Sequence, residues 1–127
     1  MGEGKGTVLV LDDEPALRLL CRVNLEFEGY RVLEAGSLED ARAALDSEPV
    51  DLALLDVHVG PDSGLDLVPD LRSLEPPAAV VVLSGTAEVT HEMRALVDGV
   101  LGKPFALEEL AAVVVRALDS PRGTPTA

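Results

Sequence analysis

The chain has 127 residues, enough for one domain with a buried core. Hydrophobic residues make up 47% of the chain and aromatic residues only 2%, so the core must be packed mainly from Val, Leu and Ala. The 23 acidic and 10 basic residues give a net charge of -13, which argues against direct nucleic-acid binding because clustered Lys and Arg are absent. The same negative charge makes a metal cation a natural ligand.

The single cysteine, Cys21, allows no internal disulfide, which fits a reducing compartment. No apolar run is long enough to span a membrane, and the N-terminus lacks the apolar stretch of a signal peptide. We therefore predict a cytoplasmic protein that makes no contact with a membrane, with Cys21 as a core residue.

Short β-branched runs alternate along the chain with amphipathic segments, a pattern typical of a parallel sheet covered by helices. The first predicted strand is TVLVL, residues 7–11. A helix over residues 15–28 follows, and Gly29 ends it. Apolar spacing assigns the inner face of this helix to Leu17, Leu20, Cys21, Asn24 and Phe27.

The next segments follow the same alternation. YRVLEA (30–35) is the second predicted strand, and Ser37 then caps a second helix, with Asp40 three residues on. DLALLD (51–56) is the third strand. Because it is nearly all apolar, we expect it at the centre of the sheet, covered on both faces. A turn-rich loop leads to a helix over about residues 65–74.

Two more strand and helix pairs complete the pattern. AAVVVLSG (78–85) is the fourth predicted strand, and a weaker helix over about 87–97 follows. The fifth strand is 99–102, and the final helix, 107–118, has the clearest helical period of apolar residues. Five such units without an internal repeat predict a doubly wound α/β fold.

The predicted domain covers residues 1–119. Residues 120–127, SPRGTPTA, are rich in Pro, Gly and Thr, and we expect a flexible tail or the start of a linker there.

Side chains that can carry chemistry follow the carboxyl ends of four predicted strands. In an open α/β sheet, ligands bind at this edge. The residues there are Asp12, Asp13, Asp56, Ser84 and Lys103. Each one alone has an ordinary structural explanation, as a helix cap, a turn residue or a surface lysine. Together they would place three carboxylates, a hydroxyl and an ammonium on one rim.

Three neighbouring carboxylates need a cation. Two such charges at about 4 Å repel by roughly 4 kcal/mol in a moderately screened site. A hard divalent cation offsets this repulsion, and Mg²⁺ prefers a few oxygen ligands together with water and phosphate. A carboxylate aimed at a phosphoryl donor can attack it in line and form an aspartyl phosphate. The pattern therefore predicts a Mg²⁺ site that accepts phosphate.

The motifs VLVLDDEP, LALLDVHVGPDSGLDL, VVVLSGTAE and GKPF occur in the order, and at roughly the spacing, found in one family. Over about residues 6–119 the chain resembles the receiver (CheY-like) domains of bacterial two-component response regulators. The resemblance implies a five-stranded parallel sheet of flavodoxin-like strand order 2-1-3-4-5, with helices on both faces. It also implies a phosphoprotein of a signal-transducing phosphorelay.

Residue by residue, the resemblance implies Asp56 as the phosphoacceptor, with Ser84 and Lys103 contacting the phosphoryl group. It also implies a cis peptide bond before Pro104. The implied Mg²⁺ ligands are Asp12 through bound water, Asp13, Asp56 and the backbone carbonyl of His58. Side chains two residues beyond Asp56 and Ser84, those of His58 and Thr86, are expected to tune the lifetime of the phosphorylated state.

The resemblance also implies partners. The phosphate would come from a sensor histidine kinase or a phosphotransfer protein, and the signal would pass to an output domain or a downstream effector protein. The chain would not be an enzyme beyond catalysing its own phosphotransfer and dephosphorylation. A homodimer is left open.

Two departures from the family pattern keep one alternative open, and chemistry shared with another class of protein keeps a second one open. Val100 stands where the family usually has an aromatic residue, and the segment from Ser84 to Lys103 is short by about one helical turn. One alternative is a degenerate receiver that acts as a binding module without phosphate. The other is a small phosphatase of the haloacid dehalogenase type, which also uses Asp, Ser or Thr, Lys and Mg²⁺, although its nucleophile lies on the first strand and Asp56 lies on the third.

Overall fold

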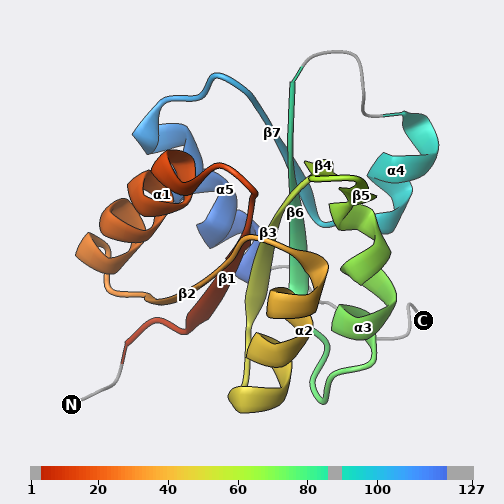
Figure 1. Cartoon of the computed structure of the whole chain (residues 1–127). Helices are drawn as coiled ribbons and strands as arrows, with labels where there is room; N and C mark the ends of the chain where they lie inside the picture. The colour runs from red at the N-terminus through yellow and green to blue at the C-terminus, as the bar shows by residue number, and fades with distance from the viewer. Residues whose placement is uncertain (1–3, 86–89, 120–127) are drawn as a thin grey trace.

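A computed structural model describes residues 4–85 and 90–119. Five parallel strands form one sheet in the order β2-β1-β3-β6-β7 (Figure 1). The strands are β1 (Thr7–Leu11), β2 (Arg31–Ala35), β3 (Leu52–Asp56), β6 (Ala79–Ser84) and β7 (Gly99–Gly102). This order is equivalent to 2-1-3-4-5, so the predicted doubly wound fold is confirmed.

Helices cover both faces of the sheet. They are α1 (Pro15–Phe27), α2 (Leu38–Ser47), α3 (Val68–Arg72), α4 (His91–Leu96) and α5 (Leu107–Asp119). Figure 1 shows α1 and α5 on one face and α2 and α3 on the other. The predicted capping residue Ser37 accepts a hydrogen bond from the Asp40 amide, so this helix start is confirmed. No described helix is long and apolar enough to cross a membrane.

Each face of the sheet has its own hydrophobic core. Successive side chains of β1 alternate between them: Val8 and Val10 pack on the side of α1 and α5, and Leu9 and Leu11 on the side of α2 and α3. Residues 52–55 of β3 are completely buried, as are their neighbours on β1. The predicted central position of the third strand is therefore confirmed.

The predicted inner face of α1 is partly wrong. Cys21 is completely buried, as predicted, and burial raises the pKa of its thiol to about 11. Leu20, however, is 46% exposed and Phe27 is 86% exposed, whereas Leu25, which was not assigned, is buried. Helix α1 carries apolar side chains on more than one face, so spacing alone could not identify the face that meets the sheet.

The region after β3 also differs from the prediction. A two-stranded hairpin of β4 (His58–Val59) and β5 (Asp62–Ser63) replaces the predicted loop. A 3₁₀ turn, η1 (Gly64–Leu67), precedes α3, so the predicted helix over 65–74 is shorter and irregular at its start. Pro69 at the second position of α3 is compatible with a helix start, where no amide partner is needed.

Helix α4 is short, and none of its residues is buried. Its C-terminal end is held by Arg72, whose Nη2 donates to the Leu96 carbonyl at 2.8 Å and whose Nη1 donates to Asp98 at 3.2 Å. The predicted helix over 87–97 is therefore confirmed only in its second half, because residues 86–89 lie outside the described part of the chain. The predicted tail, 120–127, also lies outside it.

Candidate functional site

Three carboxylates meet at the carboxyl edge of the sheet. Asp12 and Asp13 follow β1, and Asp56 ends β3, the strand that pairs with β1. One oxygen atom from each of the three lies within 4.8 Å of the others. The topology thus brings together side chains that are more than 40 positions apart in the sequence.

Asp12 is the buried member of this cluster. Its side chain is completely buried, and its Oδ1 accepts a hydrogen bond from the Glu14 amide at 2.9 Å. Burial raises the pKa of Asp12, because a charged carboxylate loses water there, and the nearby charge of Asp56 adds to the effect. The Glu14 amide and the Lys103 ammonium oppose the increase without cancelling it.

Lys103 is the cation of the site. Its Nζ lies 3.2 Å from Oδ2 of Asp12 and 3.2 Å from Oδ2 of Asp56. Burial would lower the pKa of Lys103, but the two carboxylates together outweigh burial and raise it. The peptide bond between Lys103 and Pro104 is cis, as the resemblance implied.

Ser84 ends β6, directly beside β7. Its main-chain carbonyl accepts a hydrogen bond from the Lys103 amide at 2.7 Å, so the hydroxyl-bearing residue and the lysine are joined through their backbones. The Ser84 hydroxyl donates to the Gly85 carbonyl at 3.3 Å, a long contact. The side chain is 2% exposed and lies at the same edge of the sheet as Asp56.

Asp13 is exposed and connects two loops. Its Oδ2 accepts a hydrogen bond from the Gly60 amide at 2.8 Å, across 47 positions of sequence. Gly60 has a φ of 59°, a left-handed conformation that favours glycine. His58, on β4, is exposed beside this turn. Thr86, the other residue predicted to tune the phosphorylated state, lies outside the described residues.

Gly64 supports Asp56 and was missed by the sequence analysis. It is buried, its amide donates to the Val57 carbonyl at 3.0 Å, and a Cβ atom at this position would overlap the carbonyl oxygen of Asp56. Only glycine lets η1 approach the end of β3 so closely. In the sequence the residue looks like an ordinary turn glycine, because the overlap depends on a contact that the sequence does not display.

The donor set fits a hard divalent cation such as Mg²⁺. Carboxylate oxygens are the ligands that Mg²⁺ prefers, and the three acids share one ammonium group at this edge. The pKa of Asp12 is raised first by burial and in addition by the nearby charge of Asp56, and a second positive charge at this edge would oppose both effects. The residues present are therefore suited to bind a metal and an anionic phosphoryl group together.

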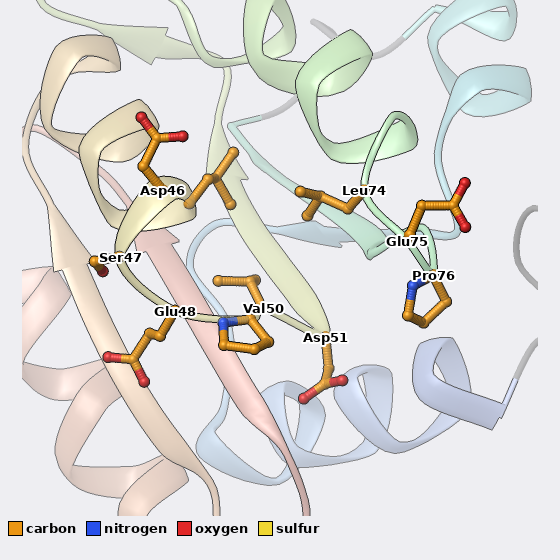
Figure 2. Close-up of a pocket in the computed structure, with 10 residues that line it drawn as sticks. Asp46, Ser47, Glu48, Val50, Asp51, Leu74, Glu75 and Pro76 are labelled. Carbon is orange, nitrogen blue, oxygen red and sulfur yellow. The ribbon is translucent and has the colours of Figure 1, made fainter.

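A pocket of about 400 Å³ lies at the opposite edge of the sheet (Figure 2). Its walls come from the end of α2, from the loop before β3, with Val50 and Asp51, and from the loop after α3, with Leu74 and Pro76. The two loops lead into the amino ends of β3 and β6. The pocket is therefore separate from the acidic edge and includes none of the predicted site residues.

Comparison with known proteins identifies the family. The family model of the response regulator receiver domain matches residues 8–115. The chain is 36% identical over 123 residues to the probable transcriptional regulatory protein TcrX of Mycobacterium tuberculosis, an alignment that covers 94% of this chain and 52% of TcrX. It is 33% identical over 120 residues to the alginate biosynthesis transcriptional regulatory protein AlgB of Pseudomonas aeruginosa, covering 92% of this chain and 27% of AlgB. The chain thus spans about half the length of the first relative and about a quarter of the second.

Solved structures agree with this assignment. The receiver domain of NtrX from Brucella abortus superposes with a TM-score of 0.80 at 29% identity, covering 89% of this chain and 98% of that one. A CheY-like response regulator receiver domain from Methanospirillum hungatei JF-1 superposes with a TM-score of 0.79 at 26% identity, covering 90% and 94%. The motifs, the strand order and these matches lead to one conclusion: the chain belongs to the response regulator receiver domains of two-component systems.

Proposed function

We propose that Asp56 of this receiver domain accepts a phosphoryl group from a sensor histidine kinase or a phosphotransfer protein. The observation that carries the proposal is the position of Asp56, which ends β3 beside two further acids and has the Lys103 ammonium 3.2 Å from its Oδ2. A carboxylate placed in this way can act as a nucleophile toward a phosphoryl donor.

Asp13, Asp56 and the backbone carbonyl of His58 would hold Mg²⁺, with Asp12 acting through a water molecule. The ion, when bound, neutralises negative charge on the carboxylates and the phosphoryl oxygens. This arrangement draws support from the hard oxygen donors of the cluster and from the buried, electrostatically costly position of Asp12.

The transfer itself is an in-line displacement. An Asp56 carboxylate oxygen bonds to phosphorus as the bond from phosphorus to the imidazole nitrogen of the donor breaks, and the electron pair leaves with the imidazole. Lys103 then moves its hydrogen bond from the Asp56 carboxylate to a phosphoryl oxygen, and the Ser84 hydroxyl donates to another. We propose that the chain catalyses only this transfer and the later hydrolysis.

The new bonds can drive a conformational switch. Phosphorylation takes Asp56 from one negative charge to nearly two. Hydrogen bonds to charged groups contribute about 1.5–3 kcal/mol each. Moving a population from about 1:99 to 99:1 needs about 5.5 kcal/mol, which two such bonds would about supply if both formed only in the active state. The Lys103 bond replaces its bond to the Asp56 carboxylate, so it contributes only its gain in strength. Ser84 and Lys103, which are joined through their backbones, would carry this change into β6 and β7.

A phosphorylation assay tests the proposal. Incubation with Mg²⁺ and acetyl phosphate should add one phosphoryl group per chain, measured by intact mass. Asp56→Asn should abolish the addition, whereas Asp62→Asn, which changes an exposed acid on β5, should not. Modification of Asp56→Asn would refute the assignment of the acceptor. If the folded, unmodified chain takes up neither phosphate nor a beryllofluoride mimic, the proposal fails.

The same assay separates the alternatives. Val100 on β7 and the short α4 are the observations that favour a degenerate receiver, which would bind a partner without phosphorylation. Repeated turnover of p-nitrophenyl phosphate would favour a phosphatase. The family match and the place of Asp56 on β3 favour neither alternative.

Relatives such as AlgB are transcriptional regulators, and this chain matches about a quarter of that protein. We propose that the signal passes to an output domain or a downstream effector, and that this domain, over residues 1–119, does not itself bind nucleic acid. The net charge of -13 supports the last point. A cytoplasmic location stays a prediction, and the oligomeric state is left open.

A further inference from the structure

Arg18 on α1 contacts the peptide bond that joins Asp12 and Asp13, two of the three acids of the site. Its Nη1 donates to the main-chain carbonyl of Asp12 at 2.7 Å, and its Nε pairs with Oε1 of Glu34 at 3.2 Å. The Arg18 side chain is only 19% exposed. On the other side of the same residue, the Asp12 amide donates to the Ala35 carbonyl at 3.1 Å. The backbone at Asp12 is therefore held from two directions.

Gly36, just after β2, leaves room for the guanidinium group. A Cβ atom at this position would lie 2.9 Å from Nη1 of Arg18, closer than real Cβ contacts. The φ of Gly36 is not in the left-handed region, so steric room is the reason for glycine here. The end of β2 therefore contributes both an ion-pair partner and the space that lets Arg18 reach Asp12.

We propose that Arg18 is a positioning residue for the Mg²⁺ site. By fixing the carbonyl between Asp12 and Asp13, it sets the direction in which the two carboxylates leave the backbone. Without this hydrogen bond the peptide plane can turn toward water and carry Asp13 away from its contact with the Gly60 amide. Groups that orient metal ligands without touching the metal commonly change metal affinity when they are removed. The inference rests on the function proposed above.

Arg22 provides a matched control. Its Nη1 pairs with Oε2 of Glu34 at 3.2 Å, and its Nε pairs with Glu26 at 3.1 Å. Each of the variants Arg18→Gln and Arg22→Gln therefore removes one positive charge that pairs with Glu34. Only Arg18→Gln also removes the hydrogen bond to the Asp12 carbonyl. A difference between the two variants isolates that hydrogen bond from the change in charge.

Mg²⁺ binding to the full chain, measured by isothermal titration calorimetry, tests the inference. Arg18→Gln should bind Mg²⁺ about tenfold more weakly than the unmodified chain. Arg22→Gln should stay within about twofold, since exposed ion pairs contribute little. In the absence of metal, hydrogen exchange of the Glu14 amide, which is bonded to Asp12 Oδ1, should be faster in Arg18→Gln and unchanged in Arg22→Gln.

Gly36→Ala is a second test that changes no charge. It should displace the guanidinium group and weaken Mg²⁺ binding in the same direction, and it carries the test if Arg18→Gln fails to fold. Equal Mg²⁺ affinity in Arg18→Gln and Arg22→Gln would overturn this inference alone. Failure of the unmodified chain to bind Mg²⁺ would overturn the proposed function and this inference with it.

Discussion

The ammonium nitrogen of Lys103 lies 3.2 Å from Oδ2 of Asp56. The same ammonium is 3.2 Å from Oδ2 of Asp12, so one cation bridges carboxylates at the carboxyl ends of two adjacent strands, β1 and β3. In the absence of metal, this bridge offsets part of the repulsion within the acidic cluster. It also places a positive charge where a phosphoryl group on Asp56 would arrive.

Lys103→Met should lower the free energy of unfolding of the metal-free protein. Loss of the ammonium leaves Asp12 and Asp56 facing each other without a counter-charge, and such a change typically costs about 1–3 kcal/mol. Chemical denaturation in the presence of a chelator would measure it. Lys5→Met, which changes the exposed lysine near Tyr30, is the control and should have a smaller effect. An equal loss in both variants would contradict a specific role for Lys103.

Mg²⁺ should stabilise the folded chain. At a concentration about 100 times its dissociation constant, a ligand that binds only the folded state adds about 2.7 kcal/mol. Thermal unfolding with and without Mg²⁺ would show this as a higher Tm. Asp13→Asn should remove most of the increase, because the amide oxygen can still accept from Gly60 but carries no charge. Asp62→Asn should keep it, and a full increase in Asp13→Asn would exclude Asp13 as a ligand.

Asp12→Asn should stabilise the metal-free chain at neutral pH. The pKa of Asp12 is raised in the folded state by burial, so the ionised carboxylate opposes folding at pH values above that pKa. As the pH falls through the folded-state pKa toward 3.8, the folded chain takes up the proton first and the cost disappears. The Tm difference between Asp12→Asn and the unmodified chain should therefore shrink on acidification. A difference that grows at low pH would contradict this sign.

Gly64→Ala should destabilise the domain and disturb Asp56. The added Cβ would overlap the Asp56 carbonyl, and overpacking of this kind costs about 1–3 kcal/mol or more. Gly102→Ala is the control, since a Cβ there meets nothing within 4 Å. Urea denaturation would give the stabilities, and the acetyl phosphate assay would show slower phosphorylation in Gly64→Ala alone. Equal stabilities of the two variants would show that η1 can move away from β3.

His58→Ala should change the rate at which the phosphorylated chain decays, without preventing phosphorylation. His58 is exposed on β4, two residues beyond Asp56, where a side chain can flank the approach of water. Decay of the phosphorylated species, followed by intact mass, would measure it. His91→Ala, which changes an exposed residue on α4, should decay like the unmodified chain. An unchanged rate in His58→Ala would refute the prediction.

The strands and most helices could be predicted because their signals are local. Short apolar runs located the ends of all five strands of the main sheet to within one residue, and the Ser37 cap located the start of α2. The face of α1 was not predictable in this way. Leu20, Leu25 and Phe27 are all apolar, and only packing against the sheet makes Leu25 the buried one.

The shared location of the three acids, the serine and the lysine could also be predicted, because parallel strands place their carboxyl ends on one edge of the sheet. Gly64 and Arg18 were not. Their roles arise from contacts with Asp56 and with the Asp12 carbonyl, and neither contact leaves a periodic or compositional signal. The pairing of Lys103 with both Asp12 and Asp56 likewise required coordinates, because residue order shows only that the three side chains share one edge of the sheet.

Local chemistry along the chain was enough to establish the alternation of strands and helices, the acidic edge and the family, because each depends on residue type and order. The buried face of α1, the hairpin after β3 and the network from Glu34 through Arg18 to Asp12 depend on how distant segments meet. Burial and hydrogen-bond geometry are properties of pairs of segments, and close packing selects one arrangement among several that the same local pattern allows.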